Sequence, residues 1–119
     1  MTTLTILMPC LNESATIESC IKKAQNFIKN SKIEGEILVA DNGSTDSSKD
    51  IAKRNGARVI EVSEKGYGET LLNGIKNSKG KYIIFADSDD SYDFSDLQPF
   101  ISKLEEGFDL VVGNRFKGE

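Results

Sequence analysis

The 119-residue chain contains no histidine, no tryptophan and only two cysteines. Without histidine, neither a Ser–His–Asp triad nor a histidine-based metal site can form. Cys10 and Cys20 match no metal-binding or redox motif, and we interpret them as small buried apolar residues of a protein from a reducing compartment. Serine hydrolases with that triad and proteins with a histidine-based metal site are therefore excluded.

Long apolar runs and an excess of positive charge are also missing. No stretch approaches the ~20 apolar residues that a membrane-spanning helix needs, and no signal peptide precedes the first apolar segment. Fifteen basic residues face 19 acidic ones, which gives a net charge of −4, so nucleic acid is not expected as a partner. We expect one soluble, cytoplasmic domain over residues 1–119.

Short apolar segments alternate with segments of helical periodicity along the whole chain. Strands are predicted over residues 4–8, 36–40, 57–62, 81–86 and 108–113, and helices in the intervals between them. Ser44 or Thr45 is expected to cap the second helix, and Ser95 with Gln98 to cap the fourth. Continuous apolar strands are typical of parallel strands covered on both faces, so the fold class is α/β with a doubly wound sheet.

Polar segments follow four of the predicted strands, at residues 9–13, 41–46, 87–93 and 114–115. The carboxyl ends of parallel strands meet at one edge of a sheet, where α/β proteins bind their ligands. We therefore expect these segments to converge on one functional edge.

The segment after the fourth predicted strand carries five carboxylates in ten residues: Asp87, Asp89, Asp90, Asp93 and Asp96. For Asp87 and Asp89, directly after a buried strand, the favoured interpretation is a hard divalent cation that bridges to phosphates. For Asp93 and Asp96 a solvated loop that caps the next helix is favoured. The loop does not fit an EF-hand, because Tyr92 and Gln98 stand at its sixth and twelfth positions.

Residues 41–46 read Asp-Asn-Gly-Ser-Thr-Asp. Gly43 permits a tight turn that does not need Asp41, so the Asp41 carboxylate is predicted to accept a hydrogen bond from a base N–H or a ribose hydroxyl. Asp46 is interpreted as a negative charge at a helix N-terminus.

Residues 65–68 read Lys-Gly-Tyr-Gly, but Leu71 replaces the last glycine of a dinucleotide fingerprint, which is rejected. A glycine-rich backbone beside an anionic ligand, with Lys65 supplying charge, and a plain surface lysine both remain open.

Together these segments resemble family 2 glycosyltransferases. Residues 9–13 (P-C-L-N-E) resemble the family's P-x-x-N-E, residues 41–46 its D-[DN]-[GS]-S-x-D turn, and residues 87–89 its DxD motif. Gly74, Ser78 and Gly80 resemble its G-x-x-x-[AS]-x-G. Residues 65–68 and 112–116 are similar to the polyprenyl-phosphate branch, the dolichol-phosphate mannose and glucose synthases. The resemblance implies the nucleotide-binding half of a three-layer, Rossmann-like GT-A domain with a mostly parallel sheet.

The resemblance also implies roles by position. Pro9, Leu11 and Glu13 would line the nucleotide, and Val39 and Asp41 would meet the base. Asp87 and Ser88 would contact ribose and diphosphate, and Asp87 and Asp89 would hold Mg²⁺ or Mn²⁺, with Asp89 as the main ligand. Arg115 would face the diphosphate or an acceptor phosphate.

The implied reaction is transfer of a sugar, with inversion, from a UDP- or GDP-linked donor to a polyprenyl phosphate at the cytoplasmic face of a membrane. Two other readings, a sugar-phosphate nucleotidyltransferase and a non-catalytic α/β nucleotide-binding module, fit the order of the motifs less well. GT-A domains are roughly twice this length, so an N-terminal piece that self-associates as a homodimer is also expected.

Overall fold

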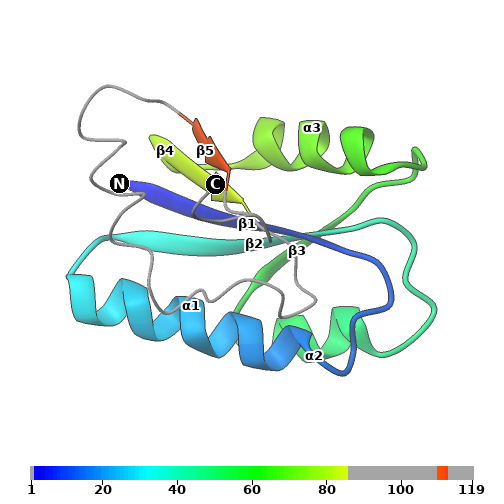
Figure 1. The fold of residues 1–119 in the computed structure, drawn as a ribbon, viewed down its shortest axis with the longest axis horizontal. Helices are drawn as coiled ribbons and strands as arrows, with labels where there is room; N and C mark the ends of the chain where they lie inside the picture. The colour runs from blue at the N-terminus through cyan, green and yellow to red at the C-terminus, as the bar shows by residue number, and fades with distance from the viewer. Residues whose placement is uncertain (1, 86–109, 113–119) are drawn as a thin grey trace.

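The computed structural model describes residues 2–85 and, as strand backbone, residues 110–112 (Figure 1). In chain order the elements are β1 (Leu4–Cys10), α1 (Ile17–Ser31), β2 (Gly35–Asp41), α2 (Ser48–Arg54), β3 (Arg58–Glu61), α3 (Tyr67–Asn77), β4 (Tyr82–Phe85) and β5 (Leu110–Val112). All strand pairs are parallel, and the sheet order is β3-β2-β1-β4-β5. The chain thus reverses its direction of strand addition between β1 and β4, which is a topological switch point.

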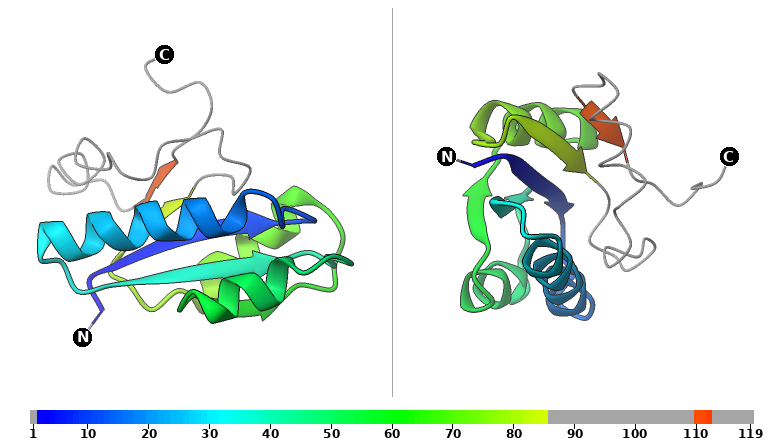
Figure 2. Two further views of the ribbon diagram at one scale, coloured as in Figure 1. Left: turned by 90° about the horizontal axis from the view of Figure 1, so that it is seen from below. Right: turned by 90° about the vertical axis from the view of Figure 1, so that its left-hand side faces the viewer.

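Helices cover both faces of this sheet. Figures 1 and 2 show α1 and α2 on one face and α3 on the other. One cluster of buried apolar side chains lies under α1 and includes Ile6, Ile21 and Val39, and a second lies under α3 and includes Leu7 and Leu38. All seven residues of β1 are buried, as expected for a central strand covered on both faces. The predicted three-layer α/β architecture is confirmed.

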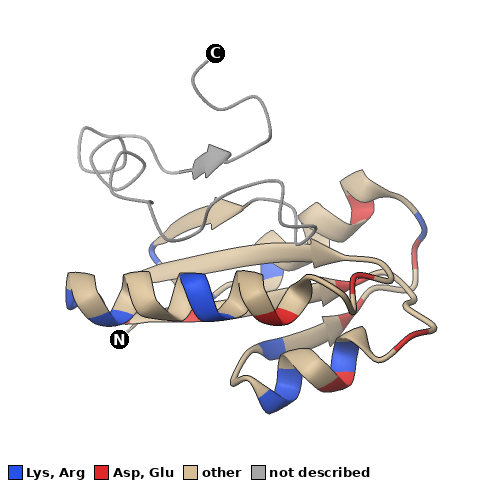
Figure 3. Ribbon diagram, turned by 60° about the horizontal axis from the view of Figure 1, so that its bottom comes forward, with Lys and Arg blue, Asp and Glu red and all other residues tan. Residues whose placement is uncertain are grey.

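Charged residues of both signs are mixed along α1 and α2 (Figure 3). Among the residues that the structure describes, no helix is long and apolar enough to cross a membrane.

The boundaries of two helices differ from those predicted. α2 begins at Ser48, with Ser47 at its N-cap and no side-chain cap hydrogen bond, so the prediction that Ser44 or Thr45 caps it is wrong. The Ser44 hydroxyl instead bonds within the turn after β2. α3 begins earlier than expected, at Tyr67, because Gly66 adopts a positive φ of 116° and turns the chain into the helix.

The helix predicted after Ser95, the acidic segment 87–93 and Arg115 lie outside the described residues. So do the side chains of β5, on which the expected homodimer partly depends.

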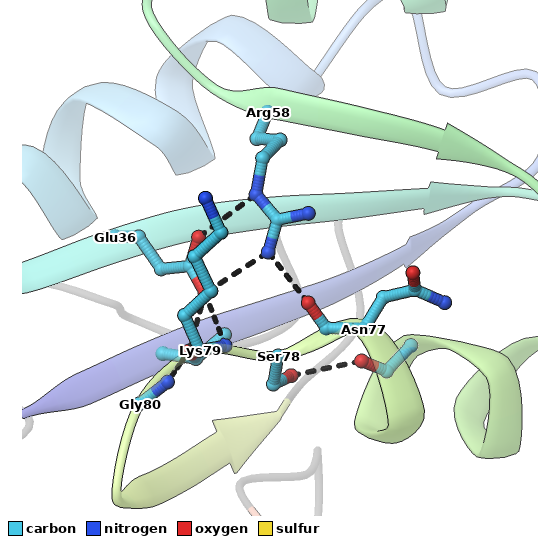
Figure 4. Close-up of polar contacts among 8 residues, drawn as sticks. Glu36, Arg58, Asn77, Ser78, Lys79 and Gly80 are labelled. Carbon is cyan, nitrogen blue, oxygen red and sulfur yellow. Dashed lines mark hydrogen bonds and ion pairs between the residues drawn. The ribbon is translucent and has the colours of Figure 1, made fainter. Parts of the chain in front are cut away.

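The amino ends of the strands are joined by a polar cluster around Glu36 of β2 (Figure 4). Its carboxylate accepts hydrogen bonds from Arg58 Nε at 3.0 Å, from Thr5 Oγ1 at 2.7 Å and from the Lys79 amide at 2.8 Å. Arg58 Nη2 also donates to the Asn77 carbonyl. Partial burial raises the pKa of Glu36, but the hydrogen bonds from Arg58, Lys79 and Thr5 outweigh it, and the net effect lowers that pKa. The cluster ties β1, β2 and β3 to the turn before β4.

Candidate functional site

The loops that follow β1, β2 and β3 meet at the carboxyl edge of the sheet, where they enclose a pocket of about 310 Å³. The pocket walls come from the end of β1, these loops and the first turn of α3: Pro9, Leu11, Asn42, Lys65, Gly66, Tyr67 and Thr70. Leu11 is 52% exposed and Tyr67 is 54% exposed. Two large side chains that are left open to solvent at a pocket give a flat ligand group a surface to pack on.

The loop after β1 is fastened to the loop after β2 by Asn12. Asn12 has a φ of 55°, a left-handed conformation that asparagine tolerates better than most residues. Its Oδ1 accepts hydrogen bonds from the amides of Thr45 at 2.8 Å and Asp46 at 3.2 Å, and its own amide donates to Ser44 Oγ. The Asn of the P-x-x-N-E segment therefore holds two site loops together.

Asp41 is fully buried, and both of its carboxylate oxygens are used by the turn that follows it. Oδ2 accepts from the amides of Gly43 at 3.1 Å and Ser44 at 2.8 Å, and Oδ1 accepts from the Ser44 hydroxyl at 2.5 Å. The expectation that the turn does not need Asp41 is wrong. A local Asx-type turn captures the side chain, as short acidic residues commonly allow.

Asp46 lies just before α2 and is exposed. Its Oδ1 accepts from the Ser48 amide and hydroxyl, and its Oδ2 accepts from the Ser14 amide at 3.1 Å. The hydrogen bonds from Ser48, followed by those from Ser14, lower the pKa of Asp46 from 3.8 to about 2. The interpretation of Asp46 as a negative charge at a helix N-terminus is confirmed, and its bond to Ser14 links the loop after β1 as well.

Asn42 connects the loop after β2 to the segment between β3 and α3. Its Nδ2 donates to the carbonyls of Val62 at 3.0 Å and Glu64 at 2.8 Å, and its Oδ1 accepts from the Gly66 amide at 3.1 Å. This segment carries Lys65, whose Nζ would lie 2.9 Å from a Cβ placed on Gly43. The Lys65 ammonium therefore lies over the turn after β2, beside the pocket.

The structure locates the predicted site residues as follows. Pro9 and Leu11 line the pocket. Glu13 is half-buried and its amide donates to Ser48 Oγ at 2.8 Å. Val39 is fully buried in the cluster under α1, so its position does not support a side-chain contact with the base. The residues Asp87, Ser88, Asp89 and Arg115 lie outside the described ranges, and their roles stay predictions.

Three pocket residues were not predicted from the sequence: Asn42, Tyr67 and Thr70. Tyr67 belongs, like Lys65, to the glycine-rich segment 65–68 that the sequence analysis considered beside a ligand. The position of this segment after a predicted strand was the signal that could have placed Tyr67 at the pocket. Asn42 directly follows Asp41 at a strand end, but nothing in the local sequence shows which residues its amide contacts. In residues 2–85 no three acidic or cysteine side chains gather closely enough to hold a metal ion.

Comparisons with known proteins agree with this arrangement. A family model described as glycosyl transferase family 2 matches residues 5–119. The low-salt glycan biosynthesis hexosyltransferase Agl6 of Haloferax volcanii is 40% identical over 118 residues, which is 98% of this chain and 28% of that protein. This chain therefore spans less than a third of that relative.

Solved structures share the fold. Glucosyl-3-phosphoglycerate synthase from Mycobacterium tuberculosis, crystallised with Mn²⁺, UDP and glucosyl-3-phosphoglycerate, is similar with a TM-score of 0.65 and 33% identity, over 73% of this chain and 33% of that one. Mannosyl-3-phosphoglycerate synthase from Rubrobacter xylanophilus has a TM-score of 0.69 over 74% of this chain and 31% of that one; at 21% identity it supports the fold alone. Since the family model covers nearly every residue and the motifs at residues 9–13 and 41–46 fall at the ends of β1 and β2, the chain belongs to glycosyl transferase family 2 and has its GT-A fold.

Proposed function

We propose that the protein transfers a sugar from a nucleoside diphosphate sugar, and that the pocket at the carboxyl edge binds the nucleotide. The observation that carries the proposal is the pocket between Leu11 and Tyr67, with the Lys65 ammonium beside it. Leu11 and Tyr67 offer exposed apolar surface to a base, and Lys65 offers a cation to an anionic group. A similar enzyme was crystallised with UDP and Mn²⁺, which supports a uridine nucleotide and a divalent ion.

The chemistry of the residues after β4 fits such an ion. Phe85, the last residue of β4, pairs with Leu7 in β1, two residues before Pro9 of the pocket. Only Ala86 separates Phe85 from Asp87 in the sequence. Carboxylate oxygens are the ligands that Mg²⁺ and Mn²⁺ prefer, and we assign Asp87 and Asp89 to hold the ion. When bound, the ion would offset the negative charge that develops on the departing diphosphate.

For the acceptor we propose a polyprenyl phosphate, with inversion at the sugar carbon. The support is the similarity of residues 65–68 and 112–116 to enzymes of that branch. A phosphate monoester has its second pKa near 6 and is already anionic at neutral pH, so it needs no general base. Arg115 would face that phosphate, and the protein would act at the cytoplasmic face of a membrane. Phosphoglycerate is the second candidate, because a similar enzyme was crystallised with phosphoglyceric acid.

Titration calorimetry with UDP and GDP, with and without Mn²⁺ or Mg²⁺, tests the donor site. We expect UDP to bind and to bind more weakly without metal, and Asp89→Asn to remove most of the metal dependence. Binding that ignores metal in the unaltered protein would contradict the assignment of Asp87 and Asp89. Binding that stays unchanged in Lys65→Ala would contradict the role given to Lys65.

The acceptor is tested by offering a polyprenyl phosphate and 3-phosphoglycerate in parallel, with a radiolabelled donor. Arg115→Ala should reduce transfer to the lipid phosphate more than it reduces UDP affinity. Equal losses would place Arg115 on the donor diphosphate, and transfer to phosphoglycerate alone would overturn the lipid acceptor.

A further inference from the structure

Asn42 uses its whole side-chain amide to hold one short segment of chain. It is 7% exposed, and its two N–H groups point at the carbonyls of Val62 and Glu64 while its oxygen receives the Gly66 amide. Reversing the amide would place oxygen against two carbonyls and nitrogen against an N–H, so the orientation is fixed by its partners.

The segment held in this way, residues 63–69, runs from the end of β3 into the first turn of α3. Residues 63–69 are all exposed, so no buried side chain anchors them. Val62 donates its amide to the Asp41 carbonyl at 2.8 Å at one end, and Thr70 bonds to the Gly66 carbonyl at the other. Between these two ends, Asn42 fixes where Lys65 and Gly66 stand on the pocket wall.

We propose that Asn42 is a positioning residue for nucleotide binding, which acts by holding Lys65 at the pocket. This proposal deepens the proposed function and rests on it. In this chain the side-chain amide of Asn42 supplies both the two N–H donors and the oxygen acceptor that the segment uses. An aspartate has the same shape but no N–H, so it would set a carboxylate against two carbonyl oxygens. Alanine would leave the same two carbonyls and the Gly66 amide without their side-chain partner.

Hydrogen exchange on the full chain tests the holding contact without any ligand. In Asn42→Ala, the peptide that spans residues 62–70 should exchange faster than in the unaltered protein, while peptides from α1 should not change. Asn55→Ala is the matched control, because Asn55 Nδ2 also donates to one backbone carbonyl, that of Ile51 at 2.8 Å, but Asn55 is not part of the pocket. Unchanged exchange at residues 62–70 in Asn42→Ala would overturn the proposal.

Calorimetry with UDP and Mn²⁺ then separates positioning from direct contact. Asn42→Ala removes all three side-chain hydrogen bonds and Asn42→Asp removes the two donated ones. Either change should weaken UDP binding about tenfold, with no change in Asn55→Ala. Because Asn42 acts through Lys65 in this proposal, Asn42→Ala should weaken UDP binding much less when Lys65 has already been replaced by alanine. Fully additive losses would mean that Asn42 touches the nucleotide itself, and a loss confined to Asn42→Asp would mean charge repulsion. Both results overturn positioning.

The failure of the two hypotheses can be told apart. If the unaltered protein binds neither UDP nor GDP, the proposed function fails, and hydrogen exchange still decides whether Asn42 holds the segment. If the unaltered protein binds UDP and all variants bind equally well, the positioning role fails and the proposed function stands.

Discussion

Two glycines that lie away from the pocket explain one of the sequence motifs. A Cβ on Gly80 would overlap the Thr5 amide nitrogen and lie 2.6 Å from the Leu4 carbonyl carbon, and a Cβ on Gly74 would lie 2.6 Å from Leu7 Cδ1. The G-x-x-x-S-x-G segment therefore brings α3 and the start of β4 close against β1. This motif therefore serves the packing of α3 and β4 against β1, and it is separate from the pocket.

Replacing Gly80 with alanine should destabilise the protein by about 1–3 kcal/mol, because the methyl group would meet backbone atoms of β1 that cannot rotate away. Gly74→Ala should lower the free energy of unfolding by less, since the atoms nearest to its added methyl group belong to the side chain of Leu7. Urea unfolding, with the midpoint and slope of each variant compared, measures both changes. A Gly80→Ala protein as stable as the original would contradict the close approach to β1.

Among the elements, the loops that lead into α1 and α2 are bonded directly to each other. Neither α1 nor α2 has a side-chain hydrogen bond at its N-cap. Instead, the loop before each helix bonds to the other loop, through Asn12 to Thr45 and Asp46, and through Asp46 to Ser14. The helix starts are thus fixed by contacts between loops that are more than 30 residues apart.

Asn12→Ala should therefore destabilise the protein by about 1–2 kcal/mol, through the loss of the acceptor for two amides and the cost of a left-handed alanine. Asn12→Asp should lower the free energy of unfolding by less, because a carboxylate oxygen can still accept the hydrogen bonds from both amides. Thermal unfolding of the two variants side by side tests this order. The reverse order, with the aspartate variant the less stable, would show that the Asn12 oxygen is not what holds the loops.

Across the whole molecule, the Glu36 cluster and the pocket lie at opposite edges of the sheet. The Glu36 cluster joins the amino ends of the strands (Figure 4). The pocket follows their carboxyl ends. The proposed site can therefore carry exposed apolar groups and a glycine-rich segment without weakening the strand pairing beneath it.

Glu36→Gln should lower the free energy of unfolding at pH 7 by about 1–2 kcal/mol, since charged hydrogen bonds to a partly exposed arginine are lost. The folded-state pKa of Glu36 lies below its ordinary value of 4.5, so its carboxylate stabilises the protein above that pH and loses the effect as the pH falls through the folded-state pKa. Urea unfolding at pH 7 and near pH 3 should therefore show the difference between the two proteins shrinking in acid.

Glu18→Gln serves as the control for this measurement. Glu18 pairs with Lys22 at 3.2 Å, but both side chains are more than half exposed, and such pairs contribute little. Its replacement should leave stability nearly unchanged at both pH values. A Glu36→Gln difference that is the same at pH 7 and pH 3 would show that the carboxylate charge is not the source of the effect.

The sequence by itself determined the order of the elements, the parallel sheet and the edge at which the loops converge. Apolar runs and helical periodicity report which faces are buried, and buried faces decide the layers of an α/β fold. The family resemblance implied that Pro9 and Leu11 line a nucleotide site, and in the structure both of them line the pocket at that edge.

Only the tertiary structure decided where the polar side chains of the loops point. Asp41 turns inward to its own turn, Asn42 reaches the segment after β3, and Lys65 lies over Gly43. The contacts of Asn42 and Lys65 join residues that are 20 or more positions apart. Periodicity carries no information about such pairs, because hydrogen bonds between loops depend on the distances that exist only after the strands have paired.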